Sequence, residues 1–193
     1  MNSILRKSIL GIAGLTVAGG LAAGPLNHDT APTARDAAVT TQAAKLDTAA
    51  LIPHGVQGNQ SHIDLTDEQT ANVKAIIAAT KKAGMDERAA VISIATALQE
   101  SKLENLGHLG DRNDHDSQGL FQQRPSSGWG TVEQITDPEY STTAFLKGLK
   151  QVDGWQDMPL TVAAQTVQVS AYPDHYAQWE QQAADLVAQH WNK

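Results

Sequence analysis

The sequence predicts a mainly α-helical fold, and three observations lead to this class. Apolar residues recur at helical spacing in several segments after residue 63, and most of these segments begin with a capping residue or a proline. A single stretch rich in Gly and Asp, residues 104–118, interrupts the helical pattern. With 193 residues, the chain is long enough for one domain with a hydrophobic core and flanking segments.

The composition excludes several classes of function. The chain has no cysteine, which rules out disulfides, zinc fingers and thiol nucleophiles. Its formal net charge is −7, spread along the chain without a basic stripe. Nucleic acid is therefore not an expected partner.

Residues 1–24 have the pattern of an export signal. Arg6 and Lys7 form a short positive region, residues 9–21 are apolar, and the small residues 22–24 suit a signal peptidase. The apolar stretch is shorter than the roughly 20 residues of a membrane span, and an uncleaved anchor is the alternative. We therefore expect a protein that is secreted or located in the cell wall.

Residues 25–62 are predicted to be a flexible linker rich in Ala and Thr. Leu46, Leu51 and Ile52 are the only clustered bulky apolar side chains in this segment. They are too few to offset the conformational entropy lost when the segment is ordered. The folded domain is expected to span residues 63–193.

Two helices are predicted at the start of this domain. Thr66 and Gln69 have the spacing of a capping box, and the helix that follows them is expected to end at Gly84. A second helix begins at Asp86, buries an apolar face and ends close to Glu100. The remaining segments are a short extended stretch at 119–123, a turn at 125–130 and helices at 139–152, 159–169 and 173–190.

Two short motifs in this domain carry a resemblance to a known family. The first is Glu100-Ser101 with Leu103, and the second is Gly119-Leu120-Phe121-Gln122 with Pro125 closing the segment. Together they resemble the lysozyme-like superfamily, in its soluble lytic transglycosylase and goose-type lysozyme branch. Residues 119–130 are also similar to a lysozyme-like module that is frequent in exported actinobacterial proteins, where it often accompanies wall-peptidase domains.

The resemblance implies a lysozyme-like helical domain with a short irregular or β segment in the cleft. It also implies cleavage of the β-1,4 bond between N-acetylmuramic acid and N-acetylglucosamine, with Glu100 as the catalytic acid. Such an acid has to keep its proton near neutral pH, and burial against apolar groups raises the pKa of a carboxyl group. We expect that environment for Glu100 at the end of its apolar helix. A solvated Glu at a helix end is the alternative.

A second carboxylate decides which reaction follows. Glycosidases use two carboxylates, whereas lytic transglycosylases lack the second one, and the 6-hydroxyl of the muramic sugar attacks to give a 1,6-anhydro product. Asp111, Asp114 and Asp116 precede Gly119, so a water-activating residue is available, and Asp111 or Asp116 is the expected one. The alternative is that these residues form caps and turns in a solvated loop.

Candidate substrate-binding residues come from the motifs and from aromatic side chains that could stack on sugar rings. Gln122 matches a family position, and a family Ala-Tyr pair that places a tyrosine near the acid is matched by the pair ending at Tyr172. Tyr176 and Trp179 are further candidates for cleft walls, with core packing as the alternative. The candidate set is Ser101, Phe121, Gln122, Gln123, Trp129 and Tyr172.

Neither a metal nor another cofactor is expected. Residues 111–116 alternate oxygen ligands, but they lack the central Gly and the terminal Glu of a calcium loop. The expected ligand is a peptidoglycan glycan strand, bound by a monomer. The competing hypothesis is a non-catalytic module of the same fold that binds peptidoglycan or docks to a partner wall hydrolase.

Overall fold

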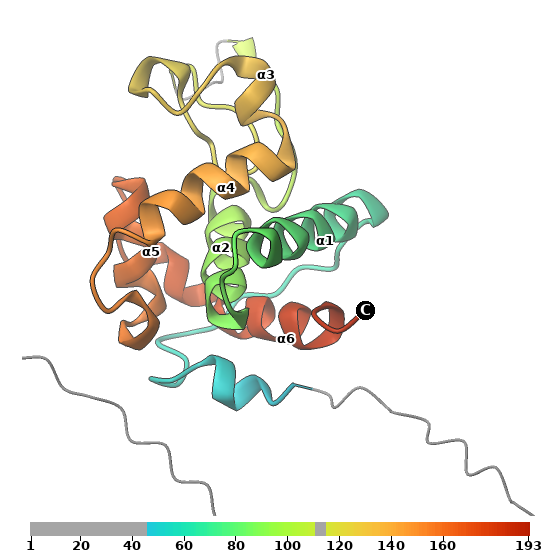
Figure 1. The fold of residues 1–193 in the computed structure, drawn as a ribbon, viewed down its shortest axis with the longest axis vertical. Coiled ribbons are helices and arrows are strands. Elements are labelled where there is room, and N and C mark those ends of the chain that lie inside the picture. Colours follow the sequence, from blue (N-terminus) through green and yellow to red (C-terminus); the bar gives the residue numbers. More distant parts are fainter. Residues whose placement is uncertain (1–45, 111–114) are drawn as a thin grey trace, which may run out of the picture. The chain divides into compact units, whose positions relative to one another are not determined.

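The computed structural model describes residues 46–110 and 115–193, and within these ranges the fold is mainly α-helical without a β-strand (Figure 1). The proposed signal segment and most of the proposed linker lie outside the described residues. None of the described helices is long and apolar enough to cross a membrane. The α-helices are α1 (Asp67–Lys82), α2 (Glu87–Ser101), α3 (Val132–Ile135), α4 (Pro138–Leu149), α5 (Leu160–Gln168) and α6 (Glu180–His190). Short 3-10 helices are η1 (Thr48–Leu51), η3 (Pro125–Ser127), η4 (Trp155–Asp157) and η5 (His175–Trp179).

Helix α2 is the central element of the domain. Every residue from Arg88 to Leu98 is buried, because α1, α4, α5, α6 and η5 all contact this helix (Figure 1). The sequence predicted one buried face, whereas the helix is covered on all sides, as expected for a helix that is apolar all round. The end of α2, which carries Glu100, is therefore fixed by packing.

The predicted helix ends are confirmed by their capping bonds. At α1, the Thr66 hydroxyl accepts from the backbone N–H of Gln69, and the Gln69 side chain accepts from the backbone N–H of Thr66. The Asp86 carboxylate accepts from the backbone N–H of Ala89 at the start of α2. Each such cap stabilises its helix by about 1 kcal/mol, and Gly84, with φ of 66°, follows the end of α1.

The stretch predicted to be extended, residues 119–123, is a tight turn rather than a strand. An isolated bridge joins Gln118 and Gln123, whose backbone N–H and C=O groups exchange two hydrogen bonds of 3.0 Å. Gly119 has φ of 77°, and a Cβ atom at this position would lie 2.0 Å from the carbonyl oxygen of Ile135. Only glycine fits between this turn and α3.

The folded domain begins before residue 63, so the predicted flexible linker is wrong for residues 46–62. Leu51 and Ile52 are buried against the helices, and the backbone N–H of Ser61 donates to the Gln178 carbonyl at 2.7 Å. We call residues 46–63 the N-terminal strap. Its few apolar side chains suffice because they extend an existing core and do not have to form one of their own.

Candidate functional site

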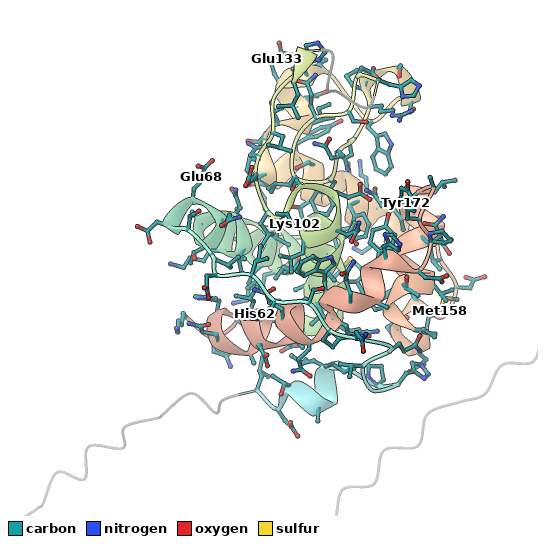
Figure 2. All side chains as sticks on the ribbon, turned by 180° about the vertical axis from the view of Figure 1, so that it is seen from behind. His62, Glu68, Lys102, Glu133, Met158 and Tyr172 are labelled. Carbon is teal, nitrogen blue, oxygen red and sulfur yellow. The ribbon has the colours of Figure 1, made fainter. Side chains whose placement is uncertain are left out.

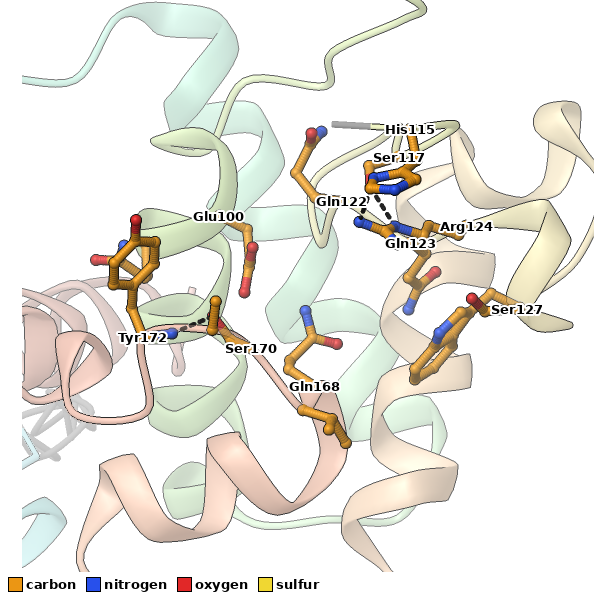
Figure 3. Close-up of a pocket in the computed structure, with 14 residues that line it drawn as sticks. Glu100, His115, Ser117, Gln122, Gln123, Arg124, Ser127, Gln168, Ser170 and Tyr172 are labelled. Carbon is orange, nitrogen blue, oxygen red and sulfur yellow. Dashed lines mark hydrogen bonds between the residues drawn. The ribbon is translucent and has the colours of Figure 1, made fainter. Parts of the chain in front are cut away.

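Glu100 lines an open cleft with a volume of about 660 Å³ (Figure 3). One wall is the end of α2, a second is the segment from His115 to Trp129, and a third is residues 168–172, which comprise the last residue of α5 and the segment after it. In Figure 3 the Glu100 carboxylate lies across the cleft from Arg124 and His115. The second and third walls come from segments that are distant from Glu100 in the sequence, so the cleft forms only in the folded domain.

The Glu100 carboxylate is held by Tyr176 of η5. The Tyr176 hydroxyl donates a hydrogen bond of 2.6 Å to Oε1 of Glu100, and the tyrosine ring is fully buried. Burial, the nearby Glu100 charge and this hydrogen bond raise the pKa of Tyr176. The phenol therefore stays protonated over the whole physiological pH range and keeps donating to the carboxylate.

Ser101 was predicted to bind substrate, but its contacts give it a structural role. Its hydroxyl lies 3.1 Å from the Ala97 carbonyl oxygen and 2.9 Å from that of Leu120, and only 6% of the residue is exposed. The side chain does not line the cleft. It joins the end of α2 to the turn at 118–123, and so sets the distance between Glu100 and the opposite wall.

Asp116 does not serve as a second catalytic carboxylate in this geometry. The backbone N–H and the hydroxyl of Ser126 both donate to its carboxylate at 2.8 Å. These two bonds lower the pKa of Asp116, and the residue does not line the cleft. The alternative assignment, a turn-forming residue, is the correct one for Asp116.

Asp111, the other candidate, lies outside the described residues. Within residues 46–110 and 115–193, Glu100 is the only carboxylate that lines the cleft. The same part of the chain holds no cluster of three or more His, Asp or Glu side chains that could bind a metal ion.

The predicted binding residues divide into two groups. Gln122, Gln123, Trp129 and Tyr172 line the cleft, and Tyr172 is 62% exposed at its rim (Figure 2). Phe121 does not line it, because the ring is fully buried and stacks on another core phenylalanine with ring centroids 5.1 Å apart. The prediction of Phe121 as a substrate contact is therefore wrong.

The family pattern pointed to Tyr172 as the tyrosine near the acid, whereas Tyr176 makes that contact. The Tyr172 ring stacks on His175, with 4.9 Å between centroids, and its backbone N–H donates to Ser170. The turn between α5 and η5 carries Tyr172 to the rim and brings Tyr176 into the core. Nothing in the local sequence distinguishes these two tyrosines.

Several cleft residues were missed from the sequence. Arg124 donates from Nε to the Ser117 hydroxyl at 3.0 Å and contacts His115 Nδ1 through Nη2 at 3.2 Å (Figure 3). Gln99 and Gln168 also line the cleft. Gln99 had a usable signal, since it is a polar residue beside Glu100 at the end of an otherwise apolar helix.

Left-handed backbone conformations concentrate at this site. In the described part of the chain, the non-glycine residues with positive φ have values from 46° to 63°. Three of them, His115, Gln122 and Val169, line the cleft, and the other two, Lys102 and Leu103, closely follow Glu100. Such conformations cost roughly 1–3 kcal/mol each and cluster at functional sites. Backbone strain therefore marks the same cleft as the acid does.

No family model matches the chain, and no curated protein matches it. A function is therefore inferred from the geometry of the cleft and from the two motifs.

Proposed function

We propose that this protein cleaves the β-1,4 bond between N-acetylmuramic acid and N-acetylglucosamine in peptidoglycan, with Glu100 as the general acid and then the general base. The observation that carries the proposal is the Glu100 carboxyl group, which lies in an open cleft with its Oε1 atom held 2.6 Å from the Tyr176 hydroxyl. A fixed carboxyl group that reaches a bound strand is the minimum that glycosidic cleavage requires.

Among the described residues, the carboxylates favour the lytic transglycosylase route over hydrolysis. Most glycosidases use a second carboxylate, whereas within residues 46–110 and 115–193 Glu100 alone lines the cleft and Asp116 is bound to Ser126 outside it. In the transglycosylase route, Glu100 first gives its proton to the glycosidic oxygen as the bond from that oxygen to C1 breaks. The Glu100 carboxylate then takes the proton of the muramic 6-hydroxyl as the oxygen of that hydroxyl bonds to C1. The product is a 1,6-anhydro end, and no water is consumed.

The location of the substrate agrees with the proposed export signal in residues 1–24, because peptidoglycan lies outside the membrane. We propose that the chain acts in the cell wall as a monomer.

The test is digestion of purified peptidoglycan by wild-type protein and by Glu100→Gln, which keeps the shape of the side chain and removes its acid. Loss of a general acid is expected to lower the rate about 100- to 10,000-fold, while the melting temperature stays near that of the wild type. Binding of both proteins to peptidoglycan without any cleavage would support the non-catalytic module instead.

A further inference from the structure

The N-terminal strap is hydrogen-bonded to the segment that carries Tyr176. Gln60 Nε2 donates to the Ala177 carbonyl at 3.0 Å, and Gln60 Oε1 accepts from the Gln181 backbone N–H at 3.0 Å. The Gln60 amide therefore joins η5 to the start of α6. Tyr176 directly precedes Ala177, so the strap fixes the backbone one residue away from the tyrosine that holds the catalytic acid.

A second chain of hydrogen bonds runs from the strap to the residue beside Glu100. The Ser61 hydroxyl donates to Gln178 Oε1 at 2.7 Å, and the Ser61 backbone N–H donates to the Gln178 carbonyl. Because Ser61 engages its oxygen, Gln178 turns its nitrogen toward Gln99 and donates to Oε1 there at 3.1 Å. The same Gln99 oxygen accepts from the Trp179 indole N–H at 2.9 Å. The end of α2 is therefore held through a side chain next to the acid.

The strap is anchored on both sides of Gln60 and Ser61. Before them, Leu51 is buried, and Arg88 Nη1 donates to its carbonyl at 3.0 Å. After them, the backbone of Ile63 exchanges two hydrogen bonds of 3.1 and 2.7 Å with the Gln182 side chain on α6. A segment fixed at both ends keeps its own side chains in place, so it can support η5.

We propose that Gln60 and Ser61 are positioning residues for the Glu100 carboxyl group. Gln60 acts through Tyr176, and Ser61 acts through Gln99. Neither residue lines the cleft, so neither is placed to contact a strand bound there. They act on the fraction of molecules whose carboxyl group points in the productive direction, and catalysis is sensitive to displacements of about 1 Å. This inference rests on the proposed function and extends its catalytic machinery into the strap.

The experiment measures kcat and KM of the full chain on purified peptidoglycan. Gln60→Met removes the amide and keeps a side chain of similar length, and Ser61→Ala removes the hydroxyl that binds Gln178. Each is expected to lower kcat about three- to tenfold, the effect of one or two lost neutral hydrogen bonds, with KM within about twofold of wild type. Ser61→Thr keeps the hydroxyl and should retain about half or more of the wild-type kcat.

Combination with Tyr176→Phe separates positioning from a loss of folded protein. Because Gln60 acts through Tyr176, Gln60→Met should lower kcat little further once the tyrosine hydroxyl is gone. A loss of folded protein would lower kcat by the same factor in both backgrounds. Ser61→Ala acts through Gln99 and should keep its full effect in the Tyr176→Phe background.

Gln57→Met is the matched control, since Gln57 is an exposed glutamine of the strap that does not line the cleft. It should keep the wild-type kcat. An unchanged kcat in both Gln60→Met and Ser61→Ala, or equal factors for Gln60→Met in the two backgrounds, would overturn the inference and leave the proposed function standing. If the wild type releases nothing from peptidoglycan, the proposed function fails and the inference fails with it.

Discussion

The Tyr176 hydroxyl lies 2.6 Å from Oε1 of Glu100, and this hydrogen bond joins η5 to the end of α2 across 76 residues of sequence. It is made inside the domain, with the tyrosine ring fully buried and the carboxyl group at the cleft surface. The contact fixes the direction of the carboxyl group, and a catalytic acid depends on such positioning as much as on its chemistry.

Tyr176→Phe should therefore reduce catalysis more than stability. Phenylalanine fills nearly the same volume, so the core stays packed. The Glu100 carboxyl group, however, loses the hydrogen bond from the Tyr176 hydroxyl. We expect kcat to fall about 10- to 100-fold with little change in KM, and the melting temperature to fall by a few degrees at most. Tyr140→Phe, at an exposed position on α4, is the control and should keep the wild-type kcat. Equal effects of the two substitutions would show that the Glu100 contact has no catalytic role.

Asp116→Asn should leave cleavage within about twofold of wild type, whereas loss of a water-activating carboxylate costs roughly 100-fold or more. Its effect is on stability, and that effect depends on pH. The Ser126 bonds lower the pKa of Asp116 in the folded state, so their contribution is fully present above the ordinary carboxyl pKa and is lost as the pH falls through the lowered value. Melting curves of the two proteins should differ at pH 7 and converge in strong acid. A constant difference at all pH values would contradict this account.

Gly119→Ala should be far more damaging than Gly128→Ala. Both glycines have positive φ, 77° and 83°, so alanine is strained at either position. A Cβ at position 119 would also meet the Ile135 carbonyl oxygen at 2.0 Å, whereas nothing lies within 4 Å at position 128. We expect a loss of about 1 kcal/mol for Gly128→Ala and about 3 kcal/mol or more for Gly119→Ala. Denaturant unfolding measures both, and similar losses would mean that the turn and α3 are not in contact.

Glu180→Gln should destabilise the domain and release the N-terminal strap. The ion pair of Glu180 with Arg88 is buried at 2.7 Å, and Arg88 also donates to the Leu51 carbonyl in the strap. Leaving a buried guanidinium without its counter-charge costs about 3–5 kcal/mol. Glu139→Gln removes an exposed pair with Lys82 and should change little. Proteolysis within the strap should accelerate in Glu180→Gln alone, and a similar rate in both variants would contradict the proposed link.

Features that depend on residues close in the sequence could be predicted, whereas features that depend on contacts across the fold could not. The caps at Thr66 and Asp86 were predictable because they involve residues at most three positions apart. Burial of Leu51 was not, because it depends on helices that come together only in the folded domain. The helix that ends close to Glu100 was predicted from its apolar pattern, whereas the turn that begins at Gly119 was predicted to be an extended stretch.

The parts of the site that could not be predicted from the sequence are contacts between residues that are far apart in the chain. The family pattern pointed to Tyr172, and only the turn after α5 brings Tyr176 to Glu100 instead. Ser101 and Phe121 belong to the motifs, yet both act in the core, since a motif marks positions that matter without separating substrate contacts from residues that support them.

The central claim is that Glu100 cleaves glycan strands by the intramolecular route, and mass spectrometry of released muropeptides tests it most directly. Purified peptidoglycan digested with the wild-type protein should yield fragments with 1,6-anhydromuramic ends, and Glu100→Gln, folded to the same melting temperature, should yield none. Fragments with reducing muramic ends would instead assign a hydrolase, and equal release by the two proteins would contradict the role of Glu100 altogether.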